Sequence, residues 1–277
     1  TRRRSAVIYS VIVLAVAAAA GVTLKAVWDS GSSTTTYSHC TVGGYDLDTS
    51  QASVAASMVA AVTSYSPHLP DRAAVLALAA GLQESKLVNL PPGAGDRDSV
   101  GVLQQRPSQG WGGGDPAVLE DVYLSTREFL DHLVTVPNWR ALPLADAVQR
   151  VQISADGSAY AQHETEATAL ASALLGRTAE GITCMFAKPT QVAATTSVEK
   201  ELSRELPVHT PQVTATTISV PGAGWQTVGW LLSNADRYGI DSVSYKGAQW
   251  TRAKGWKADK AATTSAVTAT MAVLKKS

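Results

Sequence analysis

Residues 71–85 read DRAAVLALAAGLQES, and the fold that the sequence predicts is built around this segment. From Ala73 to Leu82 it is apolar on every side, so a helix here must run through the interior of its domain. Glu84 lies on the last turn of that helix. Burial and the negative end of the helix dipole both disfavour a charged carboxylate, so we expect a raised pKa, as a general acid near neutral pH requires. The ordinary alternative is a glutamate that faces water.

Further helices are expected on either side of this one. The apolar spacing indicates them near residues 49–65, 116–134, 144–153 and 158–175, with Pro- or Gly-bearing turns between them. One long irregular stretch, 87–115, interrupts the series and is rich in Gly and Pro. A loop of that length inside a compact domain is usually functional. The pattern therefore predicts a mainly α domain with a loop and β-turn cleft.

A second motif follows in the loop, where residues 99–105 read SVGVLQQ. Its glycine would let a turn approach the end of the glutamate helix closely. Together, Glu84-Ser85 and Gly101-Val102-Leu103-Gln104 resemble the soluble lytic transglycosylases of the lysozyme-like superfamily, in which a helix ending in Glu-Ser precedes a Gly-Leu-Met-Gln turn. The stretch 101–112 is also similar to resuscitation-promoting factors, secreted lysozyme-like proteins that act on peptidoglycan. The resemblance covers about residues 47–175.

The resemblance implies an activity and a set of contacts. In that family the glutamate protonates the glycosidic oxygen and then, as a base, helps the muramyl C6 hydroxyl close onto the anomeric carbon. The residues expected to contact the substrate are Ser85, Gln104, Gln105, Trp111 and Tyr160. The two glutamines would bind N-acetyl groups or, as an alternative, pin the loop. Trp111 would stack on a sugar or pack in the core.

One segment departs from the family pattern. The family carries an Ala-Tyr-Asn-Ala-Gly segment whose tyrosine lies close to the glutamate, whereas residues 158–162 here read SAYAQ, with Gln162 in place of the asparagine and no glycine after it. A hydrolytic enzyme would need a second carboxylate, for which Asp96 and Asp98 are candidates. Both aspartates also suit Asx turns, which is the more common role in such a loop.

No metal site or cofactor is expected. His163 and Glu166 share a helix face near Glu164, but two ligands without a third are typical of a solvated helix surface.

The amino-terminal residues decide the expected compartment. Arg2, Arg3 and Arg4 precede an uncharged run, 5–24, which ends at Lys25. This predicts a membrane anchor over 1–28, followed by a spacer over 29–39, with the rest of the chain outside the cytoplasm of a single-pass cell-membrane protein. The alternative is a secreted protein whose signal is cleaved after the small residues 17–20.

Two cysteines outside the cytoplasm most simply form one disulfide. A bond between Cys40 and Cys184 would bracket a lysozyme-like domain over 40–184, and the alternative is two unpaired buried thiols.

After Cys184 the composition changes. Residues 185–223 are rich in Thr, Ala and Pro and are interpreted as a linker, and 261–277 as a flexible tail. Between them, 224–260 predicts a small aromatic-rich α+β module, with a helix over 225–238 and a β-hairpin that turns at Lys246-Gly247. Its aromatic residues would form a core or, alternatively, a groove for glycan or peptide.

Charge and hydropathy limit the function classes. The chain has 23 Lys and Arg residues in total and 23 Asp and Glu residues, so its formal net charge is zero. This neutrality argues against a nucleic-acid partner. One hydrophobic segment without charges argues against an autonomous transporter. We therefore expect an enzyme that cleaves peptidoglycan glycan strands, with peptidoglycan and, through the anchor, the lipid bilayer as partners. The main alternative is a catalytically degenerate domain that binds peptidoglycan as an envelope scaffold. Protein partners are not predicted.

Overall fold

The computed structural model describes residues 38–154, 157–207, 209–262 and 264–274. The expected anchor, 1–28, and all but the last two residues of the spacer, 29–39, lie outside these ranges. Within them, no helix combines the length and the apolar character that a bilayer crossing requires.

Helix α3 (Asp71–Ser85) is the centre of the N-terminal lobe, which we define as residues 38–185. Its bounds match the prediction, and Ala73, Ala77 and Leu78 are fully buried. The all-apolar stretch is buried all round because α2 (Thr49–Thr63), α7 (Glu164–Leu174) and the 3-10 segment η3 (Gly157–His163) pack against it. The sequence therefore predicts this element well.

The remaining helices of this lobe are shorter than expected. The helix predicted over 116–134 is two helices, α4 (Pro116–Glu120) and α5 (Val122–Leu133). Asp121 separates them because its side chain accepts a hydrogen bond from the Leu124 amide and so caps α5. Helix α6 spans Leu144–Gln152, and two 3-10 turns, η1 (Pro107–Gln109) and η2 (Trp111–Gly114), lie in the long loop.

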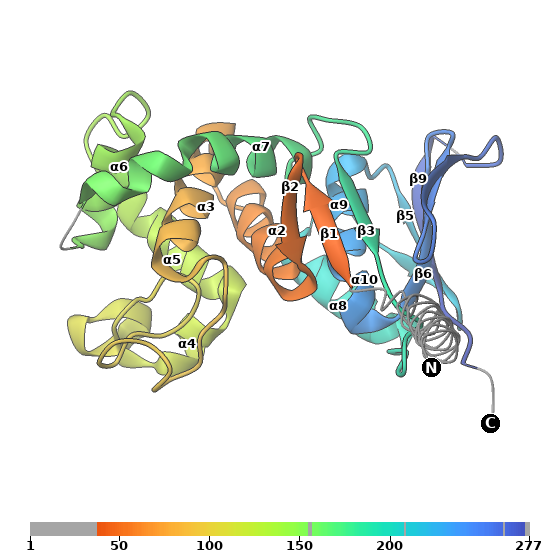
Figure 1. The fold of residues 1–277 in the computed structure, drawn as a ribbon, viewed down its shortest axis with the longest axis horizontal. Helices are drawn as coiled ribbons and strands as arrows, with labels where there is room; N and C mark the ends of the chain where they lie inside the picture. Colours follow the sequence, from red (N-terminus) through yellow and green to blue (C-terminus); the bar gives the residue numbers. More distant parts are fainter. Residues whose placement is uncertain (1–37, 155–156, 208, 263, 275–277) are drawn as a thin grey trace, which may run out of the picture. The chain divides into compact units, whose positions relative to one another are not determined.

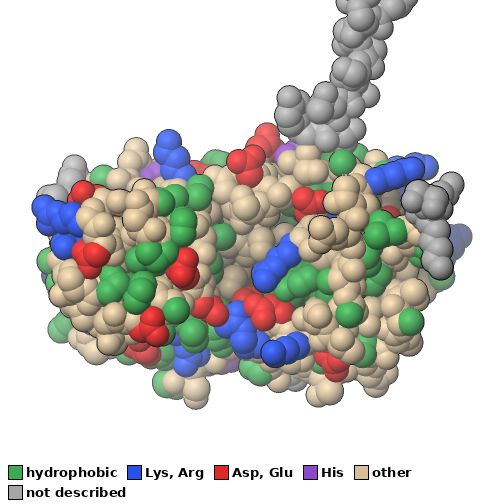
Figure 2. All heavy atoms as spheres, turned by 90° about the horizontal axis from the view of Figure 1, so that it is seen from below, with side chains coloured by type: hydrophobic (Ala, Val, Ile, Leu, Met, Phe, Trp, Pro, Cys, Tyr) green, Lys and Arg blue, Asp and Glu red, His purple; other side chains and the backbone are tan. Residues whose placement is uncertain are grey.

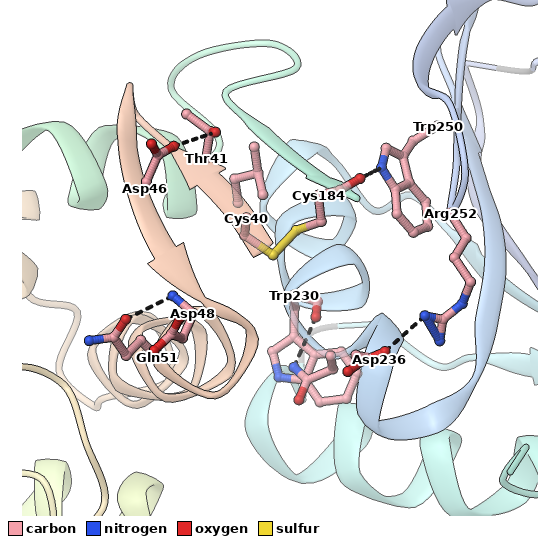
Figure 3. The surroundings of a disulfide bond; sticks show 12 residues. Cys40, Thr41, Asp46, Asp48, Gln51, Cys184, Trp230, Asp236, Trp250 and Arg252 are labelled. Carbon is pink, nitrogen blue, oxygen red and sulfur yellow. Dashed lines mark hydrogen bonds and ion pairs between the residues drawn. A yellow bond between two sulfur atoms is a disulfide. The ribbon is translucent and has the colours of Figure 1, made fainter. Parts of the chain in front are cut away.

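A three-stranded antiparallel sheet closes the lobe. Strand β1 (His39–Val42) pairs with β2 (Tyr45–Asp48) and with β3 (Ile182–Met185), in the order β2-β1-β3. Cys40 and Cys184 lie directly opposite each other in this register and form the predicted disulfide (Figure 3). The bond thus joins the two ends of the lobe.

The C-terminal lobe, residues 186–274, overturns the expected mainly α fold. Segment 185–223 is not a linker, because it contains α8 (Thr195–Glu205), β4 (Gln212–Val213) and β5 (Thr217–Pro221). The segment read as a flexible tail contains β9 (Ala266–Met271). These strands join β6 (Ile240–Tyr245), β7 (Ala248–Thr251) and β8 (Gly255–Ala258) in one antiparallel sheet, ordered β4-β5-β9-β6-β7-β8. The described chain is therefore a mixed fold with two antiparallel sheets.

These segments form strands because buried and outward-facing side chains alternate along them. In β5, Ile218 and Val220 are buried while their neighbours face outwards, and β9 repeats this pattern at Val267 and Ala269. Threonine at the outward positions suits a strand but reads as low complexity in a composition count. The predicted hairpin is confirmed as β6 and β7, which turn at Lys246-Gly247.

The two lobes share one hydrophobic core. Helix α9 (Trp225–Ser233), which precedes the short helix α10 (Ala235–Tyr238), packs against α2 and α7. The indole of Trp250 donates to the Cys184 carbonyl (Figure 3), and that of Trp256 donates to the Ile182 carbonyl. In Figure 1 the sheet β1–β3 lies between α3–α6 on one side and β5, β6 and β9 on the other.

Candidate active site

The end of α3 fixes the position of Glu84. Lys86 ends the helix in the left-handed conformation. Its amide donates to the Leu82 carbonyl, and the amide of the next residue, Leu87, donates to the Gly81 carbonyl. The Ser85 hydroxyl donates to the Val102 carbonyl at 2.8 Å. Ser85, expected to contact the substrate, therefore fastens the loop to the helix end.

Gly101 makes this close approach of the loop possible. Its φ is 79°, in the left-handed region, and a Cβ atom added there would lie 2.2 Å from the Leu119 carbonyl oxygen. Only glycine fits such a position without strain and a clash. The glycine that the sequence pattern singled out is therefore required by the geometry of the turn.

Tyr160 contacts Glu84 although the two residues lie far apart in the sequence. It lies on η3, its side chain is fully buried, and its hydroxyl donates a short hydrogen bond to Glu84 Oε1 across a separation of 76 residues. Because η3 packs directly on α3, the ring has little freedom to move away. The structure thus brings together the two residues that the sequence linked only weakly.

Gln152 is a site residue that the sequence reasoning missed. It is the last residue of α6, its side-chain amide donates to the Leu103 carbonyl at 2.8 Å, and its position beside Glu84 lowers the pKa of that carboxyl group. The loop, the helix end and α6 therefore meet at one amide. A glutamine at a helix end carries no signal in the sequence that would single it out.

The electrostatics of Glu84 follow from these neighbours. Burial raises the pKa of the Glu84 carboxyl, while hydrogen bonds from Tyr160 and Gln152 lower it and offset part of that rise. Burial also raises the pKa of Tyr160, and the bond to Glu84 raises it further, so the phenol stays protonated as a donor. A carboxyl group whose pKa is raised and that lies beside a fixed donor is suited to give and then take a proton.

The loop aspartates do not contact Glu84 in the described chain. Asp98 accepts hydrogen bonds from Arg106 Nε at 2.6 Å and from the Ser108 amide at 2.8 Å. The Ser108 and Arg106 bonds hold the pKa of Asp98 far below its usual range. Asp96 is 90% exposed and lies 3.7 Å from Arg97. Asp98 thus organises the loop, and Asp96 faces solvent.

The two glutamines belong to the structure of the loop. Gln104 has a positive φ, its amide donates to the Gly101 carbonyl, and its side-chain oxygen lies against Gly95. Gln105 is only 2% exposed, and neither polar atom of its amide finds a hydrogen-bond partner among the described residues. The pinning role, one of the two expected, describes Gln104 best.

Two ring side chains complete the surroundings. Trp111 is partly exposed and lies with its ring centroid 4.3 Å from that of His132, so it is both packed and accessible.

His163 is half-buried and its Nε2 lies 3.1 Å from the side-chain oxygen of Gln83, the residue before Glu84. Burial lowers the pKa of His163. It is therefore not the solvated surface histidine that the sequence suggested.

A cavity of about 590 Å³ lies elsewhere, between α2, α8 and α9, and does not include Glu84. No protein-family model matches the chain, and no curated protein is similar enough to it to count as a relative.

Proposed function

We propose that this protein cleaves the glycan strands of peptidoglycan by a lytic-transglycosylase type of mechanism, with Glu84 as general acid and base. The observation that carries the proposal is the hydrogen bond from the buried Tyr160 hydroxyl to Glu84 at the end of a buried helix. The raised pKa of Glu84 supports the role of acid. The resemblance of Glu84-Ser85 and of residues 101–104 to the soluble lytic transglycosylases also leads us to propose that the N-terminal lobe is related to the lysozyme-like superfamily.

The proposed reaction needs one carboxyl group. Protonated Glu84 gives its proton to the glycosidic oxygen as the bond to the anomeric carbon breaks. The ionised carboxylate, stabilised by Tyr160 and Gln152, then removes the proton from the substrate's own C6 hydroxyl as that oxygen bonds to the anomeric carbon. The proton returns to Glu84, and the product carries an anhydro ring. That Asp96 and Asp98 make other contacts favours this route over hydrolysis.

We also propose that the lobes lie outside the cytoplasm, attached to the cell membrane through the amino-terminal segment. The disulfide between Cys40 and Cys184 supports an oxidising compartment, where peptidoglycan is found.

The test is digestion of purified peptidoglycan, with mass spectrometry of the soluble products. We expect the wild-type chain to release fragments with anhydromuramyl ends, and Glu84→Gln to release none. Glu164→Gln is the matched control, because it makes the same change at an exposed position on α7 and should leave the products unchanged.

Two outcomes would contradict the proposal. Fragments with reducing ends would indicate hydrolysis and would require a second carboxylate. No fragments at all, from folded wild-type protein that still binds the polymer, would favour the envelope scaffold.

A further inference from the structure

A cavity lies where the two lobes meet and is separate from Glu84. It holds about 590 Å³ and is lined by α2, by the junction of α4 and α5, and by α8, α9 and α10. The side of the molecule that carries α4 and α8 in Figure 1 is seen face on in Figure 2, where acidic and basic side chains gather beside a hollow. A cavity of this size is large enough for a small ligand or one part of a polymer.

Its lining carries an excess of negative charge. Two arginines, Arg204 and Arg237, face five carboxylates, which are those of Glu120, Asp121, Glu201, Glu205 and Asp236. Asp236 has a further partner outside the lining, the buried Arg252, at 2.9 Å (Figure 3). That pair neutralises itself, so the rest of the lining holds four carboxylates against two arginines.

Most of the excess negative charge lies around Arg204. Its guanidinium contacts Asp121 at 3.0 Å, Glu201 at 2.6 Å and Glu205 at 3.2 Å, so one cation serves three carboxylates. Glu205 has further donors, because Ser57 and the Trp230 indole both bond it. Asp121 and Glu201 are only partly buried, at 33% and 24% side-chain exposure, and their charge remains open to a ligand. A partly enclosed site with an excess of one sign of charge concentrates ligands of the opposite sign.

A second, independent observation points to a ligand. Ser233 lines the cavity and is 2% exposed, yet its hydroxyl has no hydrogen-bond partner among the described residues. A buried hydroxyl left unpaired costs about 1–3 kcal/mol, so native structures rarely leave one without cause. The neighbouring Asn234 shows the contrast, since Ser53 and the Trp230 carbonyl bond both ends of its amide. Ser233 is therefore a polar group in this wall that a ligand would satisfy, and the side-chain oxygen of Asn89, also in the lining, is a second.

We propose that this cavity binds the ammonium group of an amine-bearing peptide, with Asp121 and Glu201 as counter-charges and Ser233 as a hydrogen-bond partner. An ammonium group supplies three donors and one positive charge, which match what the lining lacks. The choice of a peptidoglycan stem peptide with a diamino acid as the source rests on the proposed function. The ammonium chemistry itself rests on the cavity alone.

The test is calorimetric titration of the full chain with three probes. These are the tripeptide L-Ala-γ-D-Glu-L-Lys, the same peptide acetylated on its side-chain amine, and 1,5-diaminopentane. We expect the free peptide to bind at least tenfold more tightly than the acetylated one. Comparison with the diamine separates the two sources of an amine, because tighter binding of the peptide assigns the site to a peptide and tighter binding of the diamine overturns that assignment.

Two variants locate the site. Glu201→Gln should weaken binding of the free peptide at least tenfold, whereas Glu199→Gln, the same change on α8 outside the lining, should not. Ser233→Ala should weaken binding while raising the melting temperature of the free protein, because it removes an unpaired hydroxyl. Equal binding of both peptides, or no binding of any probe, would overturn the proposal. Since no glycan is cleaved in these titrations, a protein that fails to digest peptidoglycan still gives a clear result here.

Discussion

At the scale of single residues, the hydrogen bond from Tyr160 sets the chemistry of Glu84. The hydroxyl stabilises the ionised carboxylate, so its removal in Tyr160→Phe should raise the pKa of Glu84 further. Carbon-13 NMR of glutamate-labelled protein measures that pKa directly, with Glu84→Gln to assign the signal. In the pH–rate profile of peptidoglycan digestion, the alkaline limb should move to higher pH.

The control is Tyr123→Phe, which removes a hydroxyl bonded to Ser64 rather than to Glu84. This substitution should leave the pKa of Glu84 unchanged. An unchanged or lower pKa in Tyr160→Phe would contradict the role given to this tyrosine.

The buried carboxyl group also affects stability. Because its folded-state pKa is raised, the folded chain keeps this proton over a range of pH in which the unfolded chain has lost it, and stability falls as pH rises through that range. Glu84→Gln has no such loss. At pH values above the raised pKa, its melting temperature should therefore exceed that of the wild type by a few degrees. Below the ordinary value of 4.5 the difference should vanish. Thermal melts across pH check this, and a gap that persists in acid would contradict it.

At the scale of elements, the loop depends on the close contact of Gly101 with α4. Gly101→Ala introduces both a strained φ and a clash with the Leu119 carbonyl, so we expect the free energy of unfolding to fall by more than 2 kcal/mol. Gly110→Ala has a similar φ, 93°, but open space around it, and should cost only about 1–2 kcal/mol. Urea denaturation measures both, and equal losses would show that the close contact is unimportant.

The elements also show what the sequence could predict. Helix α3 and the β6–β7 hairpin were predicted because each depends on a local pattern, an all-apolar run in one and a Lys-Gly turn in the other. Strands β5 and β9 were missed because each pairs with a strand about fifty residues away, as Thr217 does with Thr270. Likewise, Glu84 had a local signal, whereas the roles of Gln152 and Asp98 depend on partners that only the folded chain brings close.

At the scale of the whole molecule, the hydrophobic core extends beyond the disulfide into the C-terminal lobe. The sequence suggested a closed domain that ends at Cys184, followed by a linker. In the structure the backbone of that last strand is bonded by Trp250 and Trp256, and α9 packs on α2 and α7. The residues around the disulfide are therefore an internal junction, where the C-terminal lobe covers apolar surface that the N-terminal lobe would otherwise expose.

A shared core predicts that both lobes unfold together. Ile218→Ala in β5 removes a fully buried side chain from the C-terminal lobe, at an expected cost of about 2–5 kcal/mol. If the lobes are one cooperative unit, hydrogen exchange in α3 should accelerate by the same factor as exchange in β5, although α3 belongs to the other lobe. Leu78→Ala in α3 should have the reciprocal effect on β5, whereas Ile153→Ala, at a side chain 83% exposed, should affect neither. Exchange in α3 that is unchanged by Ile218→Ala would mean that the lobes unfold independently, despite the tryptophans that join them.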